Sequence, residues 1–301
     1  MDAEEPMSEL VRSWVRYLRA ERKSERTVKL YQDAVRFLAE WLAEQGRPAT
    51  GAELTRDTFV DYFAASAVKD APATLLTRYR HLRTFCSFLA AEGEVAVSPM
   101  AGLTPPTAPD VPVPVLTDDE IRAMIKAAAA GPTQFLARRD EAIVRMFTDG
   151  GPRISEMASM LLAELDVDGG SVWVEGKGGR RRLVMFGAKT GRAVDRYVRA
   201  RRSHPRSSEA ALWLGQRGGL RSPGIDGRLR ALATAAGVQD VHAHRFRHTW
   251  VDDWLSAGGG EQDLKRLAGW RSDAMLARYG SSRADARARE AHHRLARGDR
   301  L

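Results

Sequence analysis

The feature that most restricts the fold of this 301-residue chain is a stretch crowded with proline. Between Ser98 and Pro114, prolines stand at positions 99, 105, 106, 109, 112 and 114. Proline has a fixed φ and no backbone N–H, so this density opposes helix and sheet and favours an extended connector. The pattern predicts a proline-rich linker over residues 99–115, with one domain at 1–98 and a second at 116–301.

Apolar residues recur at helical spacing through the first domain. Gly46 and Pro48 break a second helix, Thr55 or Asp57 is placed to cap a third, and Pro72 stands where a fourth can begin. We therefore expect a small domain of four helices.

The second domain has the pattern of a mostly helical fold with one small sheet. It opens on Thr-Asp-Asp-Glu, which is typical of a capped helix start. Over 171–186, SVWVE and RRLVMF predict two strands joined by the turn GKGGR, with Lys177 at the exposed tip. Helical patterns then return at 188–202, 222–236, 244–257, 261–268 and 283–297. The predicted fold class is mainly α with a small β-sheet.

Charge and composition narrow the class of partner. The formal net charge of +8 and the pI near 9.9 suit a polyanion such as nucleic acid, although an arginine-rich composition alone gives the same charge. The single cysteine, Cys86, cannot form an internal disulfide and lies in the apolar run FCSFL, which indicates a core position. No apolar run of about 18 residues is present, and the first residues are acidic. We expect a cytoplasmic protein with no membrane partner.

Two segments of the second domain carry side chains that can bind an oxyanion. Arg153 follows the Gly-Gly-Pro bend of GGPRISE and opens a helix, and helix N-termini favour anions; a solvated surface arginine is the alternative. Glu156 lies three residues later and either orients a cationic side chain or faces solvent. In HAHRFRHTW, His244 and Arg247 are three residues apart, so on one helix they either contact one phosphate or form a structural pair.

The order and spacing of these segments resemble the signature of the tyrosine recombinases, the phage integrase family. In that family the segments read approximately TGLRISE, GKG at a hairpin, HxLRHT, and LGHS with a tyrosine nine residues after its His or Trp. This chain has GGPRISE, GKGG, HAHRFRHT, and LAGWRS followed by ARYG, and Tyr279 follows Trp270 by 279 − 270 = 9 residues. Pro152 and Trp250 depart from the pattern beside the matched residues, not on them.

The resemblance implies a site made of Arg153, Lys177, His244, Arg247, Trp270 and Tyr279. The phenol of Tyr279 would attack a phosphodiester in line and leave a 3′-phosphotyrosine and a free 5′-hydroxyl. The bond energy is stored in this link, so the reaction needs no metal and no other cofactor. Arg153 and Arg247 would hold the non-bridging oxygens and neutralise the charge of the transition state.

The remaining residues of the site have proton-transfer or supporting roles by the same resemblance. A phenol with a pKa of about 10 is a weak nucleophile, and His244 is the candidate acceptor of its proton. Lys177 would protonate the leaving 5′-oxygen. Trp270 cannot shuttle protons, so its role is binding and packing. Glu156 would orient a cationic residue from behind the site.

The resemblance also implies the partners. A SAM-like helical core-binding domain and the catalytic domain with its C-terminal tail would bind double-stranded DNA, and exchange between two duplexes implies a homotetramer on paired sites. The chain has the size of a Xer-like recombinase. The basic side chains expected on DNA backbone phosphates are Arg180, Arg181, Arg182, Arg80 and Arg83.

Three functions compete at this point. The first is a site-specific recombinase acting through Tyr279. The second is a type IB topoisomerase-like enzyme, which shares the chemistry but relaxes DNA alone. The third is a catalytically idle DNA-binding protein derived from a recombinase, against which the complete set of site residues argues.

Overall fold

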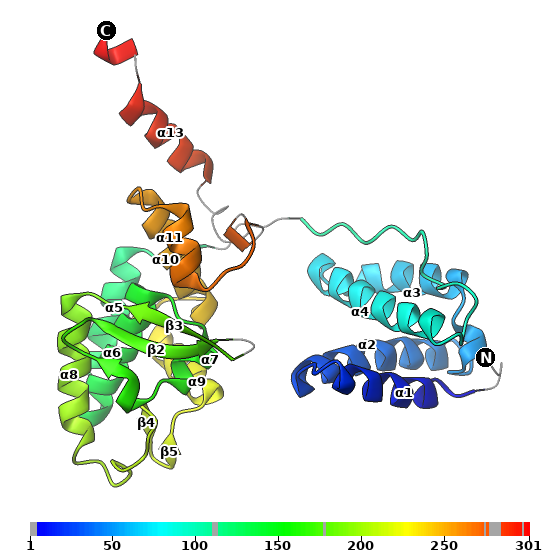
Figure 1. Ribbon diagram of the computed structural model, residues 1–301, viewed down its shortest axis with the longest axis horizontal. Coiled ribbons are helices and arrows are strands. Elements are labelled where there is room, and N and C mark those ends of the chain that lie inside the picture. The colour runs from blue at the N-terminus through cyan, green and yellow to red at the C-terminus, as the bar shows by residue number, and fades with distance from the viewer. Residues whose placement is uncertain (1–4, 110–113, 177–178, 274, 277–283, 297) are drawn as a thin grey trace. The chain divides into compact units, whose positions relative to one another are not determined.

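The computed structural model describes residues 5–109, 114–176, 179–273, 275–276, 284–296 and 298–301. The chain divides into two compact units, Met1–Val111 and Pro112–Leu301. Both units are mostly helical, and the second also contains a small sheet (Figure 1), so the predicted fold class is confirmed. Within the described ranges, no helix has the length and apolar character needed to cross a membrane.

The described part of the first unit, residues 5–109, contains four α-helices. Their starts follow from the sequence, because the hydroxyls of Ser24 and Thr55 accept hydrogen bonds from backbone N–H groups three residues later, both at 3.2 Å. Pro72 occupies the first turn of the last helix, where its missing N–H costs nothing. The helices are α1 (Met7–Ala20), α2 (Glu25–Glu44), α3 (Arg56–Lys69) and α4 (Pro72–Ala91), with a 3₁₀ turn at Gly51–Glu53.

Aromatic side chains fill the core of the first unit. Trp14 is fully buried, and its ring centroid lies 4.9 Å from that of Phe85. Cys86 is buried in the same core, as the sequence predicts. Met100 packs there too with 1% of its surface exposed, so the beginning of the proline-rich segment belongs to the core of this unit.

The second unit is built around helix α6, whose Ile143, Val144 and Phe147 are buried. Helices α5, α8 and α10 pack against it. The helices predicted after the hairpin start and end within two residues of the expected positions. The helices are α5 (Asp118–Ala129), α6 (Gln134–Gly150), α7 (Ile154–Ser159), α8 (Ala188–Arg201), α9 (Ser222–Ala236), α10 (Ala243–Ser256), α11 (Glu261–Ala268) and α13 (Ala284–Leu295), with 3₁₀ turns at Leu162–Glu164 and Gly298–Arg300.

Strands β2 (Ser171–Gly176) and β3 (Arg180–Met185) form the predicted hairpin, and β1 (Leu165–Asp166) extends it to a three-stranded antiparallel sheet. Successive side chains of a strand face opposite sides, so Val172, Val174 and Val184 are buried. In the register of the hairpin, Val174 pairs with Arg182. A second, two-residue hairpin joins β4 (Leu214–Gly215) and β5 (Gly218–Gly219).

A buried arginine ties helix α10 to the residues where the second unit begins. The Arg245 guanidinium donates to the carbonyls of Pro114 at 3.1 Å and Val115 at 3.2 Å, and forms an ion pair with Glu120. Thr249, one turn further along α10, accepts from the backbone N–H of Leu116 at 2.8 Å. These bonds fasten the start of α5 to α10.

Replacing Arg245 tests this attachment. We expect Arg245→Met to lower the free energy of unfolding by about 2 to 3 kcal/mol, because the partly exposed Glu120 carboxylate and the carbonyls of Pro114, Val115 and Gln239 lose a charged donor. The exposed pair Arg230–Asp226 offers a control, since Arg230→Met should cost less than about 1 kcal/mol. Urea denaturation measures both. Equal, small effects would show that Arg245 does not hold the two segments together.

Candidate active site

Helix ends meet at the predicted site. Helix α6 ends at Gly150, and Gly151 after it adopts the left-handed conformation with φ of +49°. A side chain at Gly151 would also collide with Trp250, because a Cβ there would lie 2.5 Å from the indole ring. Glycine at this position therefore allows the chain to turn from α6 into α7 directly beneath Trp250.

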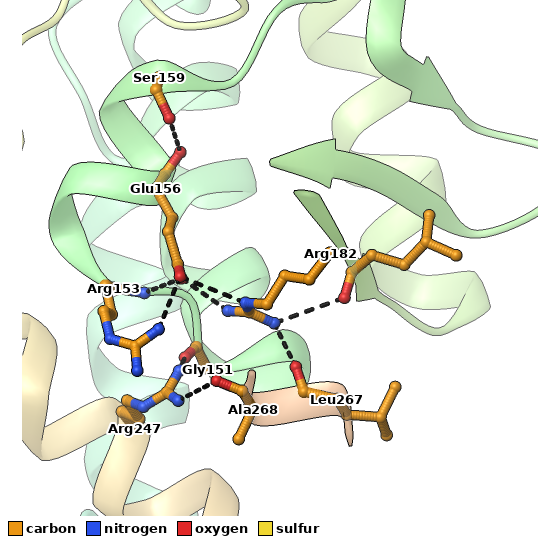
Figure 2. A network of polar contacts seen from close by, with 9 residues as sticks. Gly151, Arg153, Glu156, Ser159, Arg182, Arg247, Leu267 and Ala268 are labelled. Atoms are coloured by element: carbon orange, nitrogen blue, oxygen red, sulfur yellow. Dashed lines mark hydrogen bonds and ion pairs between the residues drawn. The ribbon is translucent and has the colours of Figure 1, made fainter. Parts of the chain in front are cut away.

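Arg247 joins the ends of two helices. The side chain is fully buried on α10, and its Nη1 and Nη2 donate to the carbonyls of Gly151 at 2.6 Å and Ala268 at 2.7 Å (Figure 2). The last carbonyls of a helix carry partial negative charge, so both are favourable partners for a cation. The guanidinium carbon lies 5.3 Å from the ring centre of Trp270 and 5.9 Å from that of Trp250.

Arg153 stands immediately before α7, at its N-cap position, with 28% of its side chain exposed. Its Nη1 donates to Glu156 Oε1 at 2.8 Å, and its backbone N–H donates to Oε2 at 2.7 Å. Arg247 contacts the carbonyl of Gly151, which lies two residues before Arg153 in the chain. The two arginines predicted to hold a phosphate are thus brought to the same short loop.

Glu156 is 1% exposed and binds two cations at once. Besides Arg153 it contacts Arg182, whose Nη2 donates to Oε2 at 2.6 Å and whose Nε donates to Oε1 at 3.3 Å (Figure 2). Burial opposes the charged form, but hydrogen bonds and the charges of Arg182 and Arg153 outweigh it and lower the pKa of Glu156 to about 2. The carboxylate is therefore ionised at neutral pH.

The other predicted residues are distributed as follows. Trp270 is 8% exposed and lies against Arg247. His244 lies in the first turn of α10 with an exposed side chain, three residues before Arg247. Lys177, between β2 and β3, and Tyr279, after Leu276, lie outside the described residues.

The arginines predicted to contact DNA phosphates occupy different environments. Arg180 is exposed at the start of β3, and Arg181 is exposed, pairs with Glu164 and stacks over Trp173 at 5.0 Å. Arg80 and Arg83 are exposed on α4 of the first unit. Arg182 differs, because its side chain is only 9% exposed and its donors are engaged inside the unit. Its contacts point to an internal role in place of the predicted phosphate contact.

Two residues of the site were not singled out as functional by the sequence. Trp250, read there only as a departure from the family pattern, covers Gly151 and lies against Arg247. Arg245, within HRFRH, supports α10 through partners more than a hundred residues away in the sequence. Across the described ranges, no group of three or more His, Cys, Asp and Glu side chains is placed to hold a metal ion.

The acid dependence of stability tests the state of Glu156. Its pKa is lowered from an ordinary 4.5 to about 2, so its contribution is fully present above pH 4.5 and is lost as the pH falls toward 2. We expect Glu156→Gln to be less stable at neutral pH by an amount on the order of 3 kcal/mol and to show a shallower loss in acid. Denaturant unfolding over this pH range measures both.

A core variant separates this effect from simple destabilisation. Phe147→Leu removes packing without removing a titrating group, so it should lower stability by a similar amount at every pH. A Glu156→Gln profile parallel to that of the wild type would contradict the lowered pKa.

Two family models match the chain. The model described as the phage integrase family matches residues 114–285, more than half of the 301 residues. The model described as the phage integrase N-terminal SAM-like domain matches residues 11–93.

Individual relatives and solved structures agree with these matches. Tyrosine recombinase XerC of Xanthomonas axonopodis pv. citri (strain 306) is 29% identical over 272 residues, which cover 86% of this chain and 87% of the relative. A crystal structure of a lambda integrase dimer bound to a COC′ core site has a TM-score of 0.72 at 16% identity and covers 92% of this chain and 95% of that one. A lambda integrase tetramer bound to a Holliday junction also gives 0.72 at 16% identity, covering 94% and 79%. At these identities the structures show the shared fold.

Proposed function

The chain belongs to the phage integrase family of tyrosine recombinases, and we propose that it is a site-specific recombinase that cleaves and rejoins double-stranded DNA through Tyr279. The observation that carries the proposal is the convergence of Arg153 and Arg247 on the loop after α6. Arg153 is exposed enough to contact a non-bridging oxygen of a phosphodiester, and the buried Arg247 adds a second positive charge at the same loop. Both charges favour the negative charge that grows as the phosphorus becomes pentacoordinate.

The two arginines differ in what holds them. Arg247 is fixed by two carbonyls and two indole rings, so it contributes a cation whose position is set before substrate binds. Arg153 keeps 28% of its side chain exposed and can turn further donors toward a substrate oxygen. The fixed guanidinium of Arg247 and the exposed guanidinium of Arg153 together can stabilise the negative charge of the transition state with little movement of protein groups during the reaction.

The remaining roles complete the reaction. The Tyr279 oxygen attacks phosphorus, the 3′-phosphotyrosine bond forms, and the bond to the 5′-oxygen breaks. The phenol proton goes to His244, which is exposed at the start of α10, and Lys177 supplies a proton to the leaving 5′-oxygen. Trp270 packs against Arg247 and takes no proton. Rejoining reverses these transfers when a 5′-hydroxyl attacks the phosphotyrosine.

The DNA contacts follow from exposed positive charge. We assign Arg180 and Arg181 of β3, and Arg80 and Arg83 of α4, to backbone phosphates, because these side chains are exposed. The first unit, whose residues 11–93 match the SAM-like model, would act as the core-binding domain. Exchange between two duplexes requires four cleavages, so the active assembly is proposed to be a homotetramer on paired sites. The reported relatives are recombinases and integrases, which favours this function over relaxation by a lone enzyme.

Covalent capture tests the nucleophile. We expect the purified chain to attach itself to a subset of a random-sequence duplex library, and the attached DNA to survive denaturation with detergent. Tyr279→Phe should lose this adduct while still binding the captured sequences in a gel-shift assay, because only the attacking oxygen is removed. Adduct formation should persist in EDTA, since the chemistry uses no metal. An adduct that survives in Tyr279→Phe would overturn the assignment.

Replacing Arg153 should slow DNA cleavage far more than it weakens DNA binding. With a nicked form of the captured duplex as suicide substrate, Arg153→Ala should lower the single-turnover cleavage rate by about 100-fold or more. Binding should fall much less, because one phosphate contact among many is lost. Equal losses in binding and cleavage would contradict a transition-state role.

Paired-site exchange distinguishes the recombinase from a relaxing enzyme. Two labelled duplexes of different length that both carry the captured sequence should yield exchanged products. Relaxation of a supercoiled plasmid without any exchange would instead support the topoisomerase-like alternative.

A further inference from the structure

Arg182 faces the interior although it belongs to a run of three arginines on an exposed hairpin. It pairs with Val174 across the sheet and lies two residues before Val184, and both valines are buried. Alternation along the strand therefore directs Arg182 inward and its neighbour Arg181 outward. The result is a side chain that is 9% exposed in one case and 56% in the other.

The guanidinium of Arg182 contacts three elements of the unit. Its Nε and Nη2 donate to the Glu156 carboxylate of α7, and its Nη1 donates to the carbonyl of Leu267 in the last turn of α11 and, at 3.4 Å, to that of Leu183 in β3 (Figure 2). Its stem passes beside Gly269, where a Cβ would lie 3.0 Å from the Arg182 Cδ. Gly269 also has φ of +67°, so this position suits glycine on both grounds.

The end of α11 is held by two arginines on neighbouring carbonyls. Leu267 accepts from Arg182, and Ala268 accepts from Arg247. Trp270 follows Ala268 by two residues, and the chain then runs to the proposed nucleophile at position 279. The orientation of this helix end therefore depends on a β3 side chain as well as on α10.

Arg182 also determines how strongly Glu156 holds Arg153. Glu156 divides its two oxygens between both arginines. Without Arg182, the buried carboxylate would have only Arg153 as a described cationic partner, and its attraction for that guanidinium would rise. Arg153 would then be drawn back toward α7 and away from an oxygen of the substrate.

We infer that Arg182 is a positioning residue of the reaction, which sets Arg153 through Glu156 and sets the end of α11 through Leu267. The inference rests on the proposed function, because the quantity it controls is the cleavage rate. Arg182 acts through other side chains and does not touch the DNA.

A double-mutant cycle tests the path through Glu156, using the nicked suicide substrate built from captured DNA. Arg182→Met should slow single-turnover cleavage by about 100-fold, the size expected when a reacting group is misplaced by roughly an ångström. Glu156→Gln in the same chain removes the charge that would retain Arg153. The double variant should therefore cleave no more slowly than Arg182→Met alone, and its loss should be far smaller than the product of the two single losses.

A conservative variant tests the second path, in which Arg182 holds the end of α11 through the Leu267 carbonyl. Arg182→Lys keeps the positive charge beside Glu156 but offers a single ammonium in place of a planar fork. It cannot satisfy Glu156 and the Leu267 carbonyl together, so its cleavage rate should lie between those of the wild type and Arg182→Met. Gel-shift affinity for the same duplex should stay within about threefold of the wild type in Arg182→Met, Arg182→Lys and the double variant, since a lost phosphate contact would instead weaken binding.

The matched control is a buried arginine outside the site. Arg139 is 3% exposed, pairs with the Asp140 carboxylate and donates to the Leu214 carbonyl, so it makes the same kinds of contact as Arg182. It lies twelve residues before Gly151, which places it about 18 Å away along the helix. Arg139→Met should lower the melting temperature without changing the cleavage rate of the folded protein.

The outcomes are distinct. The inference is supported if the double variant loses much less cleavage rate than the product of the two single losses and DNA affinity is unchanged. Multiplicative losses, a wild-type cleavage rate in Arg182→Met, or an equal slowing by Arg139→Met would overturn it while leaving the proposed function intact. A wild-type chain that forms no covalent adduct would overturn the proposed function and, with it, this inference.

Discussion

The architecture of the site depends on burying the positive charge of Arg247. A cation withdrawn from water is costly unless strong acceptors surround it, and here the carbonyls after α6 and at the end of α11 supply them. The indole rings of Trp250 and Trp270 also lie near the guanidinium, with ring centres 5.9 and 5.3 Å from its carbon. Because one side chain satisfies two helix ends, α6, α10 and α11 are fixed in one arrangement, and every other described residue of the site is placed relative to it.

The local charges leave an excess suited to an anion. The Glu156 carboxylate faces Arg153 and Arg182, with Arg247 nearby. One buried negative charge thus organises the arginines without cancelling them. The arginine side chains are therefore oriented before a phosphate binds. The free-energy cost of orienting them is met during folding and does not add to the barrier of the reaction.

Local patterns predicted most of the fold, and contacts distant in sequence account for what was missed. Alternation and the Gly-rich turn indicated the β2–β3 hairpin, and helical periodicity located α8 to α11. The inward direction of Arg182 was readable from its spacing to Val184, but its acceptor at Leu267 lies 85 residues away. The partners of Arg245 are likewise more than a hundred residues away. Lys177 and Tyr279 stay predictions that rest on the family resemblance.

The bonds of Arg245 give the second unit a mechanical property. Pro114 and Val115, where the proline-rich segment enters this unit, are fastened to the same helix that carries His244 and Arg247. A pulling force on the segment would therefore be transmitted through Arg245 to α10, at a position two residues before Arg247.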